Sequence, residues 1–241
     1  MNFYGMTDIG KRRESNQDVF YTHKFNSQTG FAIVCDGMGG QSGGHIASDM
    51  ACSIVSGRLI SGVNEITARE KIRELMVGAV SEANTEIYKR SNLEPGCKGM
   101  GTTLVLALVS GDTAYVAHIG DSRVYRMSRG ELKQVTRDHS LVQELVDQGK
   151  ISEEEMRSHP NKNMITRAVG VNLVVDIDYL EVKLEPESKL LLCSDGLTNM
   201  VTDAVIGQVL SQNSAEMACR ILVDLANAEG GVDNITVAVI E

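Results

Sequence analysis

The sequence contains no run of about 18 apolar residues that could cross a membrane. Its first residues also lack the basic and then apolar layout of a secretory signal peptide. Proline occurs only three times, and no stretch rich in glycine, serine and proline divides the chain. These absences argue against a membrane span, favour a single domain over residues 1–241, and lead us to expect a cytoplasmic protein.

Cysteine and positive charge are also scarce, and each scarcity excludes a class of protein. The five cysteines are odd in number and form no Cys-x-x-Cys pair, so neither a disulfide framework nor a zinc ribbon is indicated. Lysine and arginine total 23 against 32 acidic residues, which gives a net charge of −9. Binding to nucleic acid or to an anionic membrane surface normally requires a basic patch, so neither partner is expected.

The sequence does contain apolar periodicity of two kinds. Strand-like runs occur at 1–8, 17–25, 29–36, 102–120, 122–136, 176–185, 188–196 and 234–240. Apolar spacings of three and four residues, typical of helices, occur from Gly44 to Leu59 and at 66–90, 202–211 and 214–229. The turns Gly111-Asp112 and Arg129-Gly130 divide residues 102–136 into four strands, which we expect to form one antiparallel meander.

Strands and helices arrive in blocks rather than in strict alternation. This order predicts an α+β fold, a sandwich of two antiparallel β-sheets flanked by α-helices in four αββα layers. A parallel, doubly wound sheet is the second choice. Residues 140–168 are polar with short helical pieces, and Ser152 and Glu155 form a potential capping box there.

Aspartate residues stand at the edges of several predicted strands. The apolar runs at 31–35 and 190–193 lead into Asp36-Gly37 and into Ser194-Asp195-Gly196. The other aspartates in similar positions are Asp18, Asp121 and Asp233. A lone carboxylate buried beside apolar residues costs several kcal/mol or shifts its pKa. A positive partner is therefore expected beside them.

The residue types around these aspartates indicate which partner to expect. No cluster of histidine or cysteine accompanies the five aspartates, and an all-oxygen ligand set suits Mg²⁺ or Mn²⁺ rather than zinc or copper. Gly37, without a side chain, lets its carbonyl approach a metal or lets the chain turn sharply. An Asp-Gly pair can also mark a simple turn. That explanation suits one pair, but not five aspartates at strand edges.

The chain resembles the bacterial metal-dependent Ser/Thr protein phosphatases of type 2C, the PPM family, over nearly its full length. The matching motifs are RESNQD at 13–18, DGMGG and GGHIAS within 36–48, GTT at 101–103, GDSR at 120–123, TRDHS at 136–140, HP and NMITRAVG within 159–170, SDGLTNMV at 194–201 and GGVDNITVAVI at 230–240. They follow the family's order. The resemblance implies hydrolysis of phosphoserine and phosphothreonine on proteins, in opposition to a Ser/Thr kinase, by a protein expected to be a monomer.

The resemblance also implies a role for each aspartate. Asp36 would bridge two metal ions, either Mn²⁺ or Mg²⁺. Asp195 and Asp233 would complete one metal site. The Gly37 carbonyl and, through water, Asp18 would serve the other.

Further positions extend this assignment. Asp121, together with Asp195, matches the position that holds a weaker third ion in bacterial members, so two to three ions are expected. Arg13 matches the arginine that grips the substrate phosphate, which suits the paired donors of a guanidinium. Two metals about 3.5–4 Å apart hold a bridging hydroxide that attacks phosphorus in line, so no phosphoenzyme is required. The segment 140–168 corresponds to the family's flap.

Two departures from the family pattern leave the general acid open. Gln41 stands where many bacterial relatives carry histidine, and Met38 stands where eukaryotic members carry one. A serine or threonine alkoxide needs a proton as it leaves. The candidate donors are His45, near the start of its helix, and a water on the third ion. His139 in TRDHS is interpreted as a histidine that is hydrogen-bonded for structure.

Three other interpretations were weighed against this one. Cys52 and Arg58 have the Cys-x₅-Arg spacing of cysteine-dependent phosphatases, but they lie in a helical apolar pattern rather than an open loop. The glycine cluster at 37–44 misses both the G-x-G-x-x-G and P-loop patterns. A non-catalytic regulator that binds phosphoproteins is the alternative from another class. It is expected to have lost an aspartate or Arg13, and this chain keeps them all.

Overall fold

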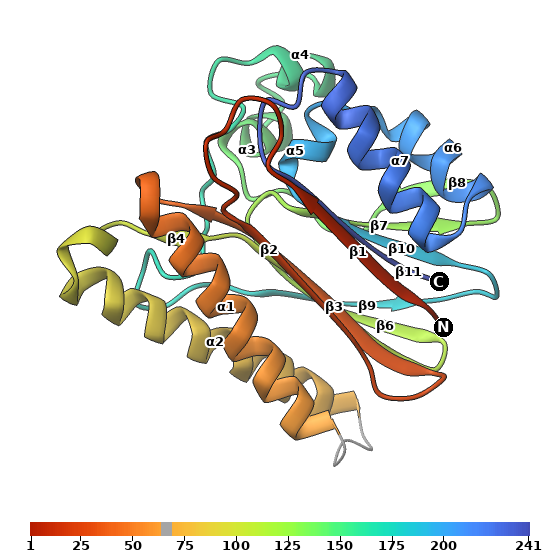
Figure 1. The fold of residues 1–241 in the computed structure, drawn as a ribbon, viewed down its shortest axis with the longest axis horizontal. Helices are drawn as coiled ribbons and strands as arrows, with labels where there is room; N and C mark the ends of the chain where they lie inside the picture. The colour runs from red at the N-terminus through yellow and green to blue at the C-terminus, as the bar shows by residue number, and fades with distance from the viewer. Residues whose placement is uncertain (64–68) are drawn as a thin grey trace.

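Two antiparallel sheets pack face to face in the computed structural model, which describes residues 1–63 and 69–241, with helices on both outer faces (Figure 1). The strand order of the first sheet is β1 (Phe3–Asp8), β11 (Ile235–Ile240), β10 (Lys189–Cys193), β7 (Arg123–Ser128) and β8 (Glu131–Gln134). That of the second is β2 (Asp18–Lys24), β3 (Thr29–Met38), β5 (Leu104–Ser110), β6 (Thr113–Ile119) and β9 (Asp178–Lys183), with β4 (Gly101–Thr102) paired to β3.

Every strand pair among the described residues is antiparallel. The predicted α+β sandwich is therefore confirmed, and the parallel, doubly wound alternative is wrong. The helices are α1 (Gly40–Gly62), α2 (Arg69–Leu93), α3 (Leu141–Asp147), α4 (Glu153–Ser158), α5 (Asp195–Thr198), α6 (Asp203–Gln212) and α7 (Ala215–Ala228), with a short 3₁₀ helix, η2 (Pro95–Cys97).

The alternation of side chains along β3 shows how the layers are stabilised. Phe31 and Ile33 belong to the apolar cluster shared with α1 and α2, whereas Ala32 and Val34 belong to the cluster between the two sheets. Successive residues of a strand point to opposite faces, so a continuous apolar run buries both faces of its sheet. A third cluster joins the first sheet to α5, α6 and α7.

One expectation about strand pairing is wrong. The four strands of residues 102–136 do not form a single meander, because β5 pairs with β6 in the second sheet and β7 pairs with β8 in the first. The chain changes sheets at Gly120, whose φ of 105° favours glycine. Turn residues specify a hairpin, but they carry no information about which sheet the next hairpin joins.

The helices agree with the predicted periodicity, with differences at their ends. The first helix begins at Gly40, four residues before its apolar stripe starts at Gly44. The helix predicted at 66–90 is α2, and its first residues lie outside the described ranges. The capping box at α4 is present, because Ser152 and Glu155 exchange side-chain hydrogen bonds with each other's backbone N–H. Among the described residues, no helix is long and apolar enough to span a membrane.

A buried side chain on α2 supports the loop that follows segment 140–168. Asn84 is 2% exposed. Its amide donates to the carbonyls of Asn172 and Leu173 at 3.0 and 3.1 Å, and its oxygen accepts from the Gly170 N–H at 2.7 Å. The loop is therefore held by three hydrogen bonds from one buried side chain, of which the bond to Gly170 is itself buried.

We expect Asn84→Ala to lower the free energy of unfolding by about 1–3 kcal/mol, because it removes three hydrogen bonds and leaves the buried Gly170 N–H without its partner. Asn92→Ala is the matched control, since Asn92 lies on the same helix but is exposed and bonds only to the Tyr88 carbonyl. Its effect should be within about 0.5 kcal/mol. Urea unfolding of both variants measures the difference, and equal losses would contradict this account.

Candidate metal centre

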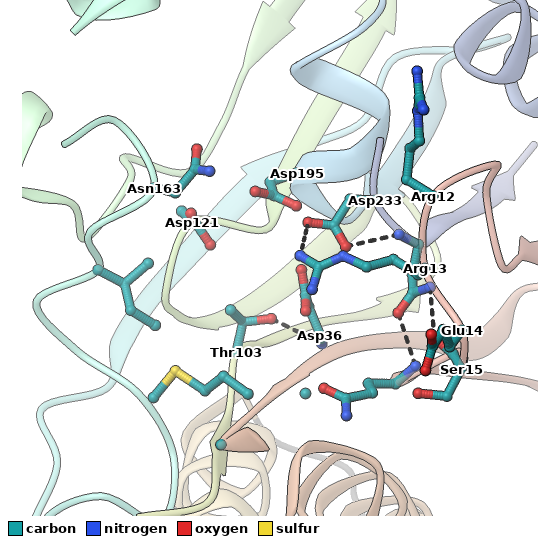
Figure 2. A pocket seen from close by; sticks show the side chains of 16 residues that line it. Arg12, Arg13, Glu14, Ser15, Asp36, Thr103, Asp121, Asn163, Asp195 and Asp233 are labelled. Carbon is teal, nitrogen blue, oxygen red and sulfur yellow. Dashed lines mark hydrogen bonds and ion pairs between the residues drawn. The ribbon is translucent and has the colours of Figure 1, made fainter. Parts of the chain in front are cut away.

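A polar pocket of about 580 Å³ opens where strand ends from both sheets meet. Its walls come from the loop after β1, the end of β3, the turn after β6, segment 140–168, the start of α5 and the loop before β11. Residues far apart in the sequence therefore converge here. Figure 2 shows the carboxyl groups of Asp36, Asp121, Asp195 and Asp233 around a common space.

The remaining predicted aspartate, Asp18, is not among the residues that line the pocket. Asp18 is 5% exposed and is the register partner of Asp36 across β2 and β3. Asp36 lies within β3 itself rather than after it, and Asp195 is the first residue of α5. The structure thus brings all five aspartates to one place.

The position of Asp36 is fixed by the chain next to it. Its backbone N–H donates to Thr103 Oγ1 at 3.0 Å, and its carbonyl accepts from the Thr103 N–H at 2.8 Å and from Thr102 Oγ1 at 2.9 Å. These bonds hold the strand end against β4. Thr103 also lines the pocket, and its hydroxyl gave no signal in the sequence beyond its place in the GTT motif.

Gly37 has a packing reason to be glycine. A Cβ at this position would lie 2.2 Å from the carbonyl oxygen of Gly44, where α1 passes over the strand. The Gly37 N–H donates to the Gln17 carbonyl at 3.1 Å. Gly37 also lines the pocket, so the glycine allows the close approach of α1 and leaves its own backbone accessible to the pocket.

The carboxyl groups raise one another's pKa values. Burial, followed by repulsion from neighbouring carboxylates, raises the pKa of Asp36 and of Asp121 well above the ordinary range. Burial raises the pKa of Asp18 to about 7, and burial followed by the charge of Asp233 raises that of Asp195 to about 6. Without a counterion these groups therefore keep their protons to a higher pH than exposed aspartates do.

Two buried carboxylate oxygens without hydrogen-bond partners among the described residues indicate that a cation fits among the carboxyl groups. Asp18 Oδ2 accepts from Ser194 Oγ at 2.7 Å, and Asp195 Oδ2 accepts from the Asn199 amide at 2.9 Å. The second oxygen of each carboxyl group, Oδ1, is buried and has no hydrogen-bond partner among the described residues. Buried polar atoms are normally satisfied. Carboxylate oxygens are the ligands that Mn²⁺ and Mg²⁺ prefer, so these residues suit either ion.

Arg13 lies at the mouth of the pocket, with about half of its side chain exposed. Its Nη2 donates to Asp233 Oδ2 at 2.7 Å. Arg12 also lines the pocket but is directed away from the carboxyl groups in Figure 2.

The loop that carries Arg13 is held by a residue that sequence reasoning missed. The side chain of Asn234 accepts from the Gln17 N–H at 2.9 Å and donates to the carbonyls of Ile9 and Ser15 at 2.9 and 3.0 Å. Its position directly after Asp233 was the only signal available. Asn163, from segment 140–168, also lines the pocket.

The structure places the histidine candidates away from the pocket. His45 is exposed on α1 and is not among the residues that line the pocket. The side chain of Gln41 lies outside what the structure describes. His139 is buried and accepts a hydrogen bond from the Gly120 N–H at 3.1 Å, in agreement with a structural role.

The cysteine-dependent alternative is inconsistent with the structure. Cys52 is 4% exposed on α1, and burial raises the pKa of its thiol to about 12. Arg58 makes an ion pair with Glu82 at 2.9 Å rather than facing the thiol. A protonated thiol inside a helix cannot act as a phosphate-attacking nucleophile.

Comparison with known proteins agrees with this geometry. A family model described as protein phosphatase 2C matches residues 10–220. The chain belongs to the protein phosphatase 2C family. The serine/threonine phosphatase stp of Listeria monocytogenes is 39% identical over 98% of this chain and 93% of its own. The protein phosphatase PhpP of Streptococcus pneumoniae is 38% identical over 98% of this chain and 95% of its own.

Solved structures of phosphatase 2C relatives have the same fold. The serine/threonine phosphatase of S. agalactiae has a TM-score of 0.92 at 38% identity and covers 99% of this chain and 98% of its own. The catalytic domain of PstP, solved in complex with two manganese ions, has a TM-score of 0.84 at 32% identity and covers 99% and 96%. The predicted enzyme class, a Ser/Thr protein phosphatase, and its Mn²⁺ or Mg²⁺ cofactors are confirmed.

Protons and Mn²⁺ should compete for the pocket carboxylates of this phosphatase 2C protein. In the folded state the pKa values of Asp18 and Asp195 are raised to about 7 and about 6. Folded-state pKa values above the unfolded ones mean that stability is lost as the pH rises through this window. Mn²⁺ favours the ionised form. The increase in Tm on adding Mn²⁺ should therefore be larger at about pH 7.5 than at about pH 5.5.

Thermal unfolding of chelator-treated protein, with and without a fixed concentration of free Mn²⁺, measures this difference at each pH. Asp36→Asn should reduce the increase at both pH values. An increase that is the same at both pH values in the unsubstituted protein would contradict the competition.

Proposed function

We propose that the protein hydrolyses phosphoserine and phosphothreonine on proteins with two to three Mn²⁺ or Mg²⁺ ions held in this pocket. The observation that carries the proposal is the set of convergent carboxyl groups beside an exposed arginine. Two of these groups have a buried oxygen with no hydrogen-bond partner among the described residues. The proposed metal ligands are Asp18, Asp36, Gly37, Asp121, Asp195 and Asp233. The proposed catalytic residues are Arg13, Asp18 and Asp36.

Asp36 is the best candidate for the ligand shared by two ions. Its pKa is raised by burial and then by the charges of all four of the other aspartates, so it lies within electrostatic reach of each one. Asp195 and Asp233 complete one proposed site. The Gly37 carbonyl and, through water, Asp18 serve the other. Asp18 is buried next to Asp36 and does not line the pocket, in agreement with an indirect contact.

When bound, the ions supply a nucleophile from water at neutral pH and neutralise the phosphate charge. The residues of the chain hold the ions and bind the substrate phosphate. The carboxyl groups lie on strands, at the start of α5 and in two short connections next to strand ends. Arg13 presents paired donors to phosphate oxygens. In this structure its partner is Asp233, and a substrate phosphate offers the guanidinium a replacement partner when a cation takes Asp233.

The proton for the leaving alkoxide is not assigned to a histidine of the pocket. No histidine is present among the described residues that line it, and His45 is exposed elsewhere on α1. A role for His45 as proton donor therefore finds no support in this geometry. We propose that solvent in the pocket near Asp121 supplies this proton.

The proposal extends to the partner, the oligomeric state and the cellular location of the enzyme. A cognate Ser/Thr kinase that forms the phosphorylated substrates is the implied opposing partner, and we propose a monomer. All five cysteines are free and buried, which suits the reducing cytoplasm. The alternative of a non-catalytic regulator gains no support, because Arg13 and the five aspartates converge on one site.

Hydrolysis of a phosphothreonine peptide tests the proposed function. Turnover should require Mn²⁺ or Mg²⁺ and stop on chelation. Asp36→Asn should lower kcat by more than about a hundredfold, because the proposed ligand shared by two ions loses its charge. Asp49→Asn, an exposed change on α1, is the matched control and should retain activity. Turnover that survives chelation, or a normal kcat in Asp36→Asn, would overturn the metal mechanism.

Arg13→Ala should lower kcat/KM by about ten- to a hundredfold, since a charge-assisted hydrogen bond to phosphate contributes about 1.5–3 kcal/mol. Mn²⁺ affinity should not fall, because Arg13 competes with a cation for Asp233. Arg12→Ala is the control, since Arg12 points away from the carboxyl groups. Steady-state kinetics and Mn²⁺ titration separate the two effects. Equal losses in both variants would exclude Arg13 as the phosphate ligand.

A further inference from the structure

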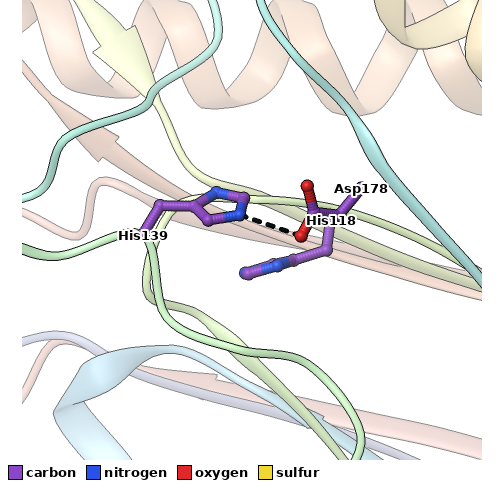
Figure 3. Close-up of side chains that lie close together, drawn as sticks. All are labelled: His118, His139 and Asp178. Carbon is purple, nitrogen blue, oxygen red and sulfur yellow. Dashed lines mark ion pairs between the residues drawn. The ribbon is translucent and has the colours of Figure 1, made fainter. Parts of the chain in front are cut away.

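Three ionisable side chains lie close together outside the pocket (Figure 3). His118 and His139 are 0% and 6% exposed, and their ring centroids are 4.5 Å apart. His139 Nε2 lies 3.2 Å from Asp178 Oδ2. One potential ligand atom from each residue falls within 4.8 Å of the others. Two imidazoles and a carboxylate are a donor set that zinc accepts.

The hydrogen bonds argue against a metal at this cluster. The Gly120 N–H donates to His139 Nδ1 at 3.1 Å. In a neutral imidazole with Nδ1 as acceptor, Nε2 carries the proton, so it donates to Asp178 rather than accepting from Arg167 Nη1, which lies 3.3 Å away. A metal on Nε2 would require a proton on Nδ1, facing the Gly120 N–H. Asp178 Oδ1 also accepts from Arg167 Nη1 at 2.9 Å. A hydrogen-bonded chain therefore runs from Arg167 through Asp178 and His139 to Gly120. The ring nitrogens of the buried His118 have no hydrogen-bond partner among the described residues.

This chain of contacts ends next to the pocket. Gly120 directly precedes Asp121, and His139 bonds to Gly120 twice, because the His139 N–H also donates to the Gly120 carbonyl at 2.8 Å. The His139 carbonyl accepts from the Thr166 N–H at 2.8 Å, so the end of segment 140–168 is tied to the same residue. Asp121 lines the pocket, whereas His139 does not.

The backbone at Gly120 needs such support. Its φ is 105°, and a Cβ there would lie 2.6 Å from Thr103 Cγ2. Thr103 in turn bonds to the backbone of Asp36. Because the turn changes sheets at this point, no strand partner holds Asp121. Asp121 is supported on one side by the bonds on Gly120 and on the other by the bond of 2.7 Å between Ser122 Oγ and Thr103 Oγ1.

We propose that His139, oriented by Asp178 and Arg167, is a positioning residue that holds the Gly120–Asp121 turn so that the Asp121 carboxyl group reaches the pocket. The inference rests on the proposed function, in which Asp121 is a ligand of the most weakly bound ion. Loss of the His139 acceptor should therefore weaken that ion and leave the tighter ions in place. Residues that orient a ligand typically change metal affinity by about 10–100-fold.

Two substitutions separate the two ring nitrogens. In His139→Asn the side-chain oxygen can replace Nδ1 and accept from Gly120, whereas in His139→Gln the side-chain amide can replace Nε2 and donate to Asp178. Electron paramagnetic resonance of free Mn²⁺ measures the affinity of each class of ion without turnover. His139→Gln and His139→Ala should weaken the loosest class by about 10–100-fold, and His139→Asn should remain near the unsubstituted protein.

Asp121→Ala provides the reference for the same class of ion. If His139 acts through Asp121, His139→Gln should cause no further loss of Mn²⁺ affinity in the Asp121→Ala background. Thermal unfolding identifies any variant that does not fold. Among the folded variants, the Mn²⁺ affinities of His139→Asn and His139→Gln decide whether the inference holds. Equal Mn²⁺ affinities in these two variants, or a loss in Asn alone, would overturn the inference.

The proposed function is tested separately. If the unsubstituted protein hydrolyses the phosphothreonine peptide with Mn²⁺ but His139→Gln binds all ions normally, the inference fails and the function stands. If the unsubstituted protein shows no loosely bound ion, the inference also fails. Co²⁺ spectra typical of a tetrahedral site, lost in His118→Ala, would reveal a metal at the histidine cluster and would likewise overturn it.

Discussion

Mutual repulsion among buried carboxyl groups is the constraint on which the site depends. Asp36 lies within electrostatic reach of four other aspartates, and burial raises its pKa further. The fold keeps such a cluster because large apolar interfaces on both sides of each sheet stabilise the scaffold. A divalent cation among these groups would offset the repulsion and would offer the orphaned oxygens of Asp18 and Asp195 a partner, directly or through water. The same arrangement therefore opposes folding without metal and favours binding with it.

Hydrogen bonds from uncharged side chains hold this cluster in place. Thr103 holds the backbone of Asp36, Ser194 holds one oxygen of Asp18, and Asn234 holds the loop that carries Arg13. Each of these bonds joins segments that are distant in the sequence. Ser194 Oγ is itself held by a second bond, because it accepts from the Thr236 N–H at 3.0 Å. Ligand positions fixed in this way require little rearrangement when a cation or a phosphate arrives.

Local patterns explain how much of this could be predicted. The strands, the long helices and the capping box at Ser152 follow from apolar period and end residues, which act over a few residues. The five aspartates were identifiable because a carboxyl group at the end of an apolar run is costly. The change of sheet at Gly120 was not predicted, since pairing between sheets depends on contacts that no local pattern encodes. Asn234 and Thr103 were missed for a related reason. Their polar side chains are ordinary in the sequence, and only the folded chain shows what they bind.

The ion pair between Arg13 and Asp233 joins residues 220 positions apart, and β1 pairs only with β11 in its sheet. Long-range contacts of this kind form late, because a long loop must close before they contribute. During synthesis on the ribosome, the segment with Arg13 emerges well before Asp233 does. A nascent chain with Asp36 already exposed therefore lacks both Asp233 and β11, the strand that pairs with β1. The order of translation thus delays assembly of the proposed metal site until β11 has left the ribosome.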